Sequence, residues 1–182
     1  MDLDIDHLRG WIGNSETMSE RLTPQLVERF NATLDIEEDA VAGAEAPQMI
    51  HFCLAQPVAP ASRLGHDGHP KRGGFLPPVS LPRRMWAGGE ITFHAPLVID
   101  EIVTRTSRIY DVEVKQGRSG MLCFVTVIHE YTCGGALAAA APAAARGGAA
   151  RAGAAGSGAG RGARAAEAAQ CIVDPIPAAR EG

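Results

Sequence analysis

The chain has 182 residues and a formal net charge of -4, and residues 1–133 carry 12 basic against 18 acidic side chains. This acidic balance excludes a nucleic-acid partner, because such binding depends on Lys and Arg contacts to phosphates. No apolar run is long enough for a transmembrane helix, and the acidic N-terminus is unlike a signal peptide. The four cysteines form no CxxC pair, so we expect free thiols, a cytoplasmic location and no membrane partner.

The N-terminal residues predict a helix followed by a strand. Residues 4–13 have an apolar helical face, and Gly13-Asn14 would end that helix. Residues 16–22 are expected to form a short strand. The helical face consists of Ile5, Leu8 and Ile12.

A second helix is predicted to begin at Thr23-Pro24. Thr is a good N-cap, and Pro suits the first helical position because its missing N–H would be unpaired there. Acidic and small residues over 37–47 then indicate a loop, and the short apolar run 49–54 fits either a helix or a strand. The apolar face of the helix carries Leu26, Val27, Phe30 and Leu34.

Residues 57–82 are predicted to be irregular, since they hold six prolines and four glycines. A loop of this length inside a compact domain is usually either functional or disordered. Basic and aromatic residues at its end favour a functional loop.

Period-two patterns begin after Gly89. They predict strands over 91–94, 101–115 and 121–132, with a glycine-bracketed hairpin over 115–120 joining the last two. Apolar residues lie on both faces of the strand 121–132, so we expect it to be covered on both sides.

The character of the sequence changes after Cys133. Residues 136–170 contain 19 Ala, 7 Gly and 4 Arg in 35 positions, with no periodicity. We therefore divide the chain into a folded domain, 1–133, and a disordered Ala/Gly/Arg-rich tail, 134–182. The tail is either a genuine flexible segment or the product of a frameshift in a GC-rich gene, because GC-only codons encode this composition.

Three histidine-bearing segments could carry chemistry. His66-Asp67-Gly68-His69 is either a metal site or a polar turn, and its spacing matches no zinc pattern, so we expect no metal. His94 and His129 could each be an acid or base, or a structural strand residue. No hydrolase or metalloprotease motif is visible, so no catalytic residue is assigned.

The segment Arg83-Arg84-Met85-Trp86 is also suggestive. Two guanidinium groups beside an indole can hold a phosphate and stack on a planar ring. Equally, Trp86 could anchor the core while Arg83 and Arg84 are solvated.

Several motifs that occur in order over residues 1–133 resemble the N-terminal domain of MaoC-like (FAS1-like) dehydratases. Within that group the sequence is most similar to mesaconyl-CoA (itaconyl-CoA) hydratases, which are related to hydroxyacyl-thioester dehydratases. The motifs are Arg72-Gly73-Gly74-Phe75-Leu76-Pro77-Pro78-Val79, Leu81-Pro82-Arg83-Arg84-Met85-Trp86-Ala87-Gly88-Gly89, Phe93-His94-x-Pro96-Leu97, Lys115-x-Gly117-Arg118-Ser119-Gly120 and Phe124-Val125-x-Val127-x-His129-Glu130.

The resemblance implies an α+β double hot-dog fold, in which each repeat wraps an antiparallel sheet around a helix. It implies reversible addition of water to an α,β-unsaturated acyl-CoA thioester, with no cofactor. Family members run to about twice the folded length seen here, and their second repeat carries the catalytic His with its acidic or Asn partner. This chain would then be the substrate-binding half, with Arg83, Arg84, Trp86, Gly88 and Gly89 as the substrate-binding residues.

Other functions remain open. The chain could be a non-catalytic hot-dog subunit, a truncated inactive gene product or a thioesterase, the last having no convincing helix-borne carboxylate in its favour. A single repeat that ended near Cys133 would expose a long sheet edge, so we expect a homodimer or a heteromer with a second hot-dog repeat.

Overall fold

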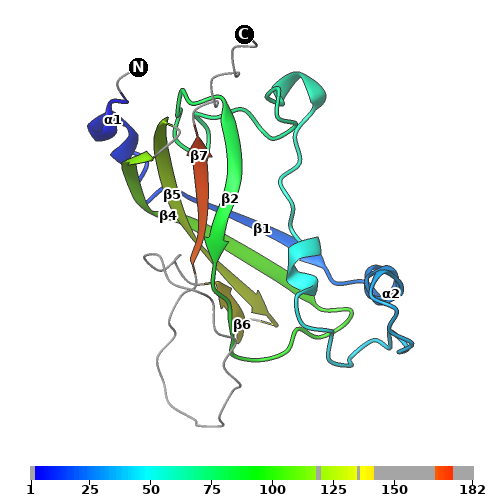
Figure 1. Ribbon diagram of the computed structural model, residues 1–182. Coiled ribbons are helices and arrows are strands. Elements are labelled where there is room, and N and C mark those ends of the chain that lie inside the picture. Colours follow the sequence, from blue (N-terminus) through cyan, green and yellow to red (C-terminus); the bar gives the residue numbers. More distant parts are fainter. Residues whose placement is uncertain (1–2, 118–119, 135, 142–166, 174–182) are drawn as a thin grey trace.

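The computed structural model describes residues 3–117, 120–134, 136–141 and 167–173 (Figure 1). Within these ranges the chain forms a seven-stranded antiparallel sheet, two α-helices and two 3-10 turns. The elements are α1 (Ile5–Arg9), β1 (Ser15–Arg21), α2 (Pro24–Thr33), η1 (Ile50–Cys53), η2 (Ala61–Arg63), β2 (Arg83–Gly89), β3 (Thr92–Phe93), β4 (Ile102–Gly117), β5 (Gly120–Cys133), β6 (Ala136–Ala141) and β7 (Glu167–Val173).

The long strands β4 and β5 form the centre of the sheet and confirm the predicted pair. They run antiparallel from Val103 opposite Cys133 to Gly117 opposite Gly120, with an irregularity between Ile109 and Asp111. One face of β5 is mostly buried and the other is mostly half-buried, which agrees with the expected cover on both sides. The hairpin residues 118 and 119 lie outside the described residues.

The N-terminal elements also match their predictions, although α1 is shorter than expected. Asp4 caps α1 by accepting a hydrogen bond from the His7 amide at 3.0 Å. β1 pairs antiparallel with β4 from Ser15 to Arg21. Thr23 caps α2, its hydroxyl accepting from the Leu26 amide at 3.3 Å, and Pro24 is the first residue of the helix.

The prediction that residues 134–182 lack structure is wrong for two segments. β6 pairs with β5 over His129–Cys133, and β7 pairs with β5 over Leu122–Ile128. Strand pairing uses backbone groups, so the unpaired edge of β5 is a template for a segment without any hydrophobic pattern. The rest of the predicted tail, 142–166 and 174–182, lies outside the described residues.

The irregular segment ends at residue 82, as predicted, but the strand that follows it was not predicted. Residues 83–89 form β2, which pairs with β7 and has a bulge between Trp86 and Gly88. Figure 1 shows β7 lying between β2 and β5. β3 is shorter than its prediction and pairs with β6 through Thr92 and Phe93.

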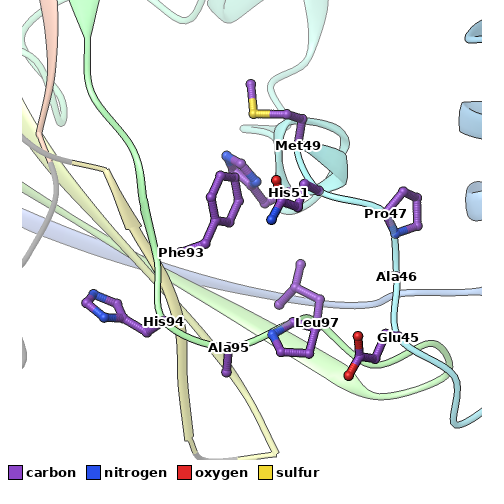
Figure 2. A pocket seen from close by; sticks show the side chains of 11 residues that line it. Glu45, Ala46, Pro47, Met49, His51, Phe93, His94, Ala95 and Leu97 are labelled. Atoms are coloured by element: carbon purple, nitrogen blue, oxygen red, sulfur yellow. The ribbon is translucent and has the colours of Figure 1, made fainter. Parts of the chain in front are cut away.

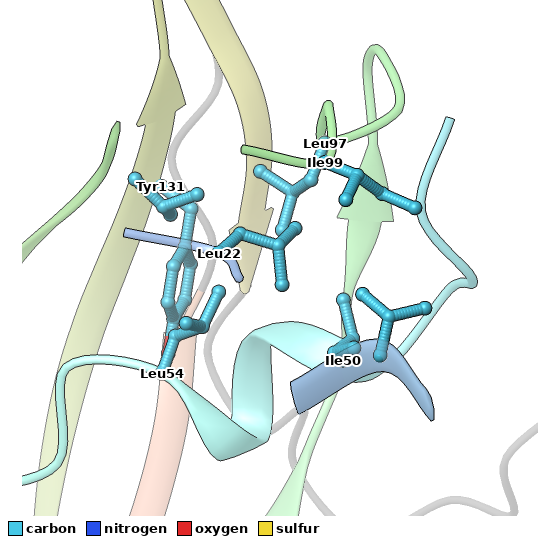
Figure 3. Packing of buried hydrophobic residues seen from close by; sticks show 8 residues of the cluster. Leu22, Ile50, Leu54, Leu97, Ile99 and Tyr131 are labelled. Atoms are coloured by element: carbon cyan, nitrogen blue, oxygen red, sulfur yellow. The ribbon is translucent and has the colours of Figure 1, made fainter. Parts of the chain in front are cut away.

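Two hydrophobic clusters cover the same face of the sheet. The first surrounds Leu22 and joins β1, η1, the segment before β4 and the sheet (Figure 3). The second lies towards the hairpin end of β4 and β5. The buried members of the first are Leu22, Val27, Ile50, Leu54, Leu97, Ile99, Val103 and Tyr131; those of the second are Leu8, Val79, Leu81, Ile109, Val112, Cys123, Val125 and Val127.

The resemblance predicted that a helix would cover the sheet, but in the structure a loop supplies much of this cover. The longest described helix, α2, has 10 residues and contributes Val27 to the first cluster from beside the end of β1 (Figure 1). Much of the remaining cover comes from residues 44–82, which place Leu54 in the first cluster and Val79 and Leu81 in the second. The prolines of this segment oppose a continuous helix. None of the described helices is long and apolar enough to span a membrane.

Candidate functional site

A cavity of about 290 Å³ opens between two segments that flank the first hydrophobic cluster (Figure 2). One segment runs from Glu45 to His51, which lies in η1. The other runs from Phe93, the last residue of β3, to Leu97. The lining is mainly apolar, with a few polar groups. Its side chains are Glu45, Ala46, Pro47, Gln48, Met49, His51, Phe93, His94, Ala95, Pro96 and Leu97.

Backbone hydrogen bonds hold the two walls together. The Gly43 amide donates to the Ile99 carbonyl at 2.8 Å, and the Ile99 amide donates to the Ala44 carbonyl at 2.9 Å. The Ala46 amide donates to the Leu97 carbonyl at 2.8 Å. This short antiparallel ladder fixes the floor of the cavity on the folded core.

Met49 lies at the rim in a left-handed backbone conformation, with φ 72°. A residue with a Cβ pays a steric cost in this region. Because Met49 is the N-cap residue of η1, this conformation starts the turn that brings His51 to the wall. Strain of this kind concentrates at functional sites.

His51 is the buried polar group of the cavity wall. It is 2% exposed, and its ring packs against Phe93 at a centroid distance of 5.7 Å and against Tyr131 at 4.9 Å. Burial lowers its pKa to about 4, so the imidazole is neutral at neutral pH. Its Nε2 has no hydrogen-bond partner among the described residues. A neutral imidazole can donate or accept a hydrogen bond, so a ligand that reached this buried atom would pair with it.

Behind His51, several buried polar side chains lie next to one another along the centre of the sheet. Arg105 is 7% exposed and donates from Nη2 to the Glu16 Oε1 at 3.3 Å. His129 Nδ1 is hydrogen-bonded to Ser107 Oγ at 2.8 Å. Burial, with the nearby Arg105 charge and His51, lowers the pKa of His129 to about 4. Burial also raises the pKa of Tyr131.

All five predicted substrate-binding residues lie in β2, but they differ in exposure and in their contacts. Arg83 is exposed, and Trp86 is 69% exposed, so it does not anchor the core. Arg84 is largely buried and pairs with Asp67, Nε to Oδ2, at 3.5 Å. Gly88 and Gly89 pair with Ala169 and Ala168 of β7. None of these five residues lines the cavity at His51.

The remaining histidine predictions resolve differently. The segment 66–69 forms a polar turn, in which the His69 amide donates to Asp67 Oδ1 at 3.1 Å. Within the described residues no group of three His, Cys, Asp or Glu side chains could hold a metal ion. His94 lines the cavity, whereas His129 lies in the buried polar group of β5.

Sequence reasoning did not single out His51. The run 49–54 was ambiguous in structure, and a histidine within it gave no sign of burial. The motif Phe93-His94-x-Pro96-Leu97 did mark the opposite wall. Pro47 and Pro96 both line the cavity. To predict that they lie on facing walls, one would have to know the backbone hydrogen bonds between their segments.

Comparison with known protein families gives a specific match. The sequence profile of the hydroxyacyl-thioester dehydratase type 2 family matches residues 48–138, which include the wall from Phe93 to Leu97 and the second half of the other wall, from Gln48 to His51. A mesaconyl-C(4)-CoA hydratase from Chloroflexus aurantiacus is 41% identical over 129 residues. The aligned part is 68% of this chain and 46% of that protein. The chain therefore spans less than half the length of this relative.

Among solved structures, a chain of the ChsH1-ChsH2 complex from Mycobacterium tuberculosis is similar, with a TM-score of 0.59 at 13% sequence identity. The match covers 94% of this chain and 94% of that chain. At this identity the likeness shows the fold alone. It supports the predicted α+β hot-dog arrangement of the antiparallel sheet.

Proposed function

Because this chain belongs to the hydroxyacyl-thioester dehydratase type 2 family, which is MaoC-like, we propose that it binds the acyl-CoA substrate of a hydratase/dehydratase. The reaction would be the reversible addition of water to an α,β-unsaturated thioester of the enoyl-CoA or mesaconyl-CoA type. The 41% identity to a mesaconyl-C(4)-CoA hydratase supports this substrate class. We further propose a cytoplasmic location, because the thiols of Cys53 and Cys133 are free.

The observation that carries this proposal is the cavity at His51. Its apolar walls suit a short acyl group, because binding pockets combine hydrophobic lining with a few placed polar atoms. Phe93 and Leu97 supply apolar surface, and the unpartnered Nε2 of buried His51 supplies the polar atom. A neutral imidazole there can hydrogen-bond a thioester or carboxyl oxygen without bringing a charge into the pocket.

Hydration of the double bond needs more than this cavity. A base must activate water for attack at the β carbon, an acid must protonate the α carbon, and donors must stabilise the enolate-like oxygen. In our proposal this chain holds the acyl group, and the acid–base pair belongs to a second hot-dog repeat. Arg83, Arg84, Trp86, Gly88 and Gly89 stay the predicted contacts for the CoA portion.

A second candidate function is a non-catalytic hot-dog subunit that pairs with a separate catalytic chain. The observation in its favour is the match to a ChsH1-ChsH2 chain, which covers 94% of both chains. That protein is described as part of a two-protein complex. We propose the same kind of partner here, a hot-dog protein that completes the site.

Calorimetry with crotonyl-CoA and free CoA tests the proposal. We expect the purified chain to bind crotonyl-CoA more tightly than CoA. Ala95→Phe would fill the cavity from an exposed position of its wall and weaken crotonyl-CoA binding about tenfold or more. The matched control Ala32→Phe, on the exposed surface of α2, should bind like the wild type.

Equal binding of crotonyl-CoA and CoA, or equal effects of the two Phe variants, would remove the acyl pocket from the proposal. Enoyl absorbance, followed with and without a candidate hot-dog partner, tests what the two functions share, because both expect turnover only with the partner. Crotonyl-CoA binding to the chain alone separates them, because only the first function requires this chain to hold the acyl group. Turnover by the chain alone contradicts both candidates, since both place the acid–base pair elsewhere.

A further inference from the structure

A second cavity, of about 190 Å³, lies beside the first residues of β2 and does not share a lining residue with the cavity at His51. Its wall contains three cationic side chains, Lys71, Arg72 and Arg84, and one carboxylate, Asp67. This local excess of positive charge contrasts with the formal net charge of -4 for the whole chain. A cleft lined by one sign of charge attracts ligands of the opposite sign.

A tight turn places Asp67 in this cavity. The Gly65 amide donates to the His69 carbonyl at 2.7 Å, and the His69 amide donates to the Asp67 carboxylate at 3.1 Å. A Cβ at Gly65 would come within 2.9 Å of that carboxylate, so a larger residue there would displace it. The turn thereby directs the other carboxylate oxygen towards Arg84.

Arg84 is a buried cation with incomplete hydrogen bonding. Its side chain is 8% exposed, and its Nε lies 3.5 Å from Asp67 Oδ2. Its Nε has no hydrogen-bond partner among the described residues. Burial lowers the pKa of Arg84, while Asp67 opposes this and Arg72 adds to it. A buried donor that has a counter-charge but no hydrogen bond is costly, so an acceptor that reached it in good geometry would stabilise the site.

The other two cations are held by neutral groups. Arg72 donates to the backbone carbonyls of Val79, Leu81 and Pro82, which fixes the guanidinium in the wall. The exposed Lys71 donates from Nζ to the Ser62 carbonyl at 3.1 Å. Carbonyls satisfy donors without cancelling charge, so the positive charge remains available to an anion.

We propose that this cavity binds a phosphoryl anion, with Arg84 and Lys71 as its hydrogen-bond donors and Arg72 as fixed positive charge. Asp67, which already pairs with Arg84, competes with the anion for it. The inference deepens the proposed function, because CoA carries phosphoryl groups, but it also applies to free phosphate. Arginine and lysine together are well suited to phosphate. The planar guanidinium of arginine can donate two parallel hydrogen bonds, and the ammonium of lysine is a compact charge on a flexible side chain.

Calorimetry with inorganic phosphate, CoA and 3′-dephospho-CoA tests this site on the full chain. We expect saturable phosphate binding that Lys71→Gln weakens at least about fivefold. Asp67→Asn should tighten phosphate binding about threefold or more, because it removes the competing carboxylate. Arg29→Gln, which removes an exposed cation from α2, is the matched control and should bind like the wild type.

The direction of the Asp67→Asn effect decides the matter. Unchanged or weaker phosphate binding in that variant, with its fold intact by circular dichroism, overturns the proposal, as does the absence of saturable phosphate binding to the wild type. Tighter binding of CoA than of 3′-dephospho-CoA assigns the site to the 3′-phosphate; equal binding of these two assigns it to another phosphoryl group. Phosphate binding without crotonyl-CoA binding would retain this site and remove the acyl-CoA function.

Discussion

His51 and Tyr131 pack edge to face, with ring centroids 4.9 Å apart and an interplanar angle of 65°. This contact joins the wall of the apolar cavity to the central strand of the sheet. Tyr131 lies opposite Arg105 in the β4–β5 register, and Ser107 lies opposite His129. A ligand in the cavity would therefore lie one side chain away from a buried group of polar residues.

The two buried histidines predict a specific acid sensitivity. Burial lowers the pKa values of His51 and His129 from 6.5 to about 4. Below pH 6.5 the unfolded chain therefore binds protons that the folded chain does not. Each histidine should reduce the free energy of unfolding by on the order of 3 kcal/mol as the pH falls from 6.5 to about 4.

Urea unfolding at several pH values measures this dependence. His129→Gln should flatten the curve between pH 6.5 and 4, because it removes one of the two groups that take up protons on unfolding. His94→Gln, at an exposed position, is the control and should leave the slope unchanged. Parallel curves for wild type and His129→Gln would contradict the assignment.

Glu16→Gln should destabilise the fold by leaving the buried Arg105 without its counter-charge. The Arg105 side chain is 8% exposed and that of Glu16 27%. Removing one partner of a largely buried pair leaves an uncompensated charge, so we expect a loss of about 2–3 kcal/mol of unfolding free energy.

The surface pair Arg21–Asp100, also at 3.3 Å, is the matched comparison. Both of its side chains are about half exposed, so Asp100→Asn should cost only about 0.2–1 kcal/mol. Equal losses in Glu16→Gln and Asp100→Asn, measured by urea unfolding, would show that burial of Arg105 has no effect.

The Arg72 side chain is expected to stabilise the segment before β2. Its guanidinium accounts for three carbonyl contacts, to Val79, Leu81 and Pro82. Arg72→Met keeps much of the side-chain volume but removes these donors, so we expect a loss of about 2–4 kcal/mol. Arg63→Met, at an exposed position of η2, should change the unfolding free energy by less than about 0.5 kcal/mol. Similar midpoints for the two variants would contradict this role.

Met49→Gly separates stability from binding. Glycine adopts a φ of 72° without the steric cost that Met49 pays, so the variant should be as stable as the wild type or more stable by up to about 1 kcal/mol. It also removes a side chain from the rim of the cavity. We therefore expect weaker crotonyl-CoA binding in a chain of undiminished thermal stability. A clear fall in the melting temperature would show that the Met49 side chain stabilises η1.

Local signals were sufficient for the parts of the fold that are determined locally. The Thr23-Pro24 pair predicted the start of α2, and alternating residues predicted β4 and β5. These signals succeed because capping and period-two burial act within one segment. Leu22, with 0% exposure, follows directly on β1 in the first hydrophobic cluster, at the end of the predicted strand.

The elements that the sequence did not predict depend on distant partners. Residues 83–89 include two glycines and no alternating apolar pattern, yet they form β2 because β7 pairs with their backbone. β6 is mostly Ala and is positioned by β5 and β3. Dependence on distant partners also explains why only some of the functional residues were predicted. Arg84 was predicted, but its partner Asp67 and the neighbouring Lys71 come from a turn whose position no local pattern encodes.

The pairing of β2 with β7 constrains the order in which the protein can fold during synthesis. Among the described strands β2 pairs only with β7, so Arg83 must await Val173, which the ribosome adds 90 residues later. The β4–β5 hairpin can form as soon as both of its strands have emerged, but β2 then has no strand to pair with. Such distant pairing slows folding and leaves backbone groups open to incorrect partners meanwhile. A nascent chain released before β7 should therefore be a substrate for chaperones, even though its central hairpin is already formed.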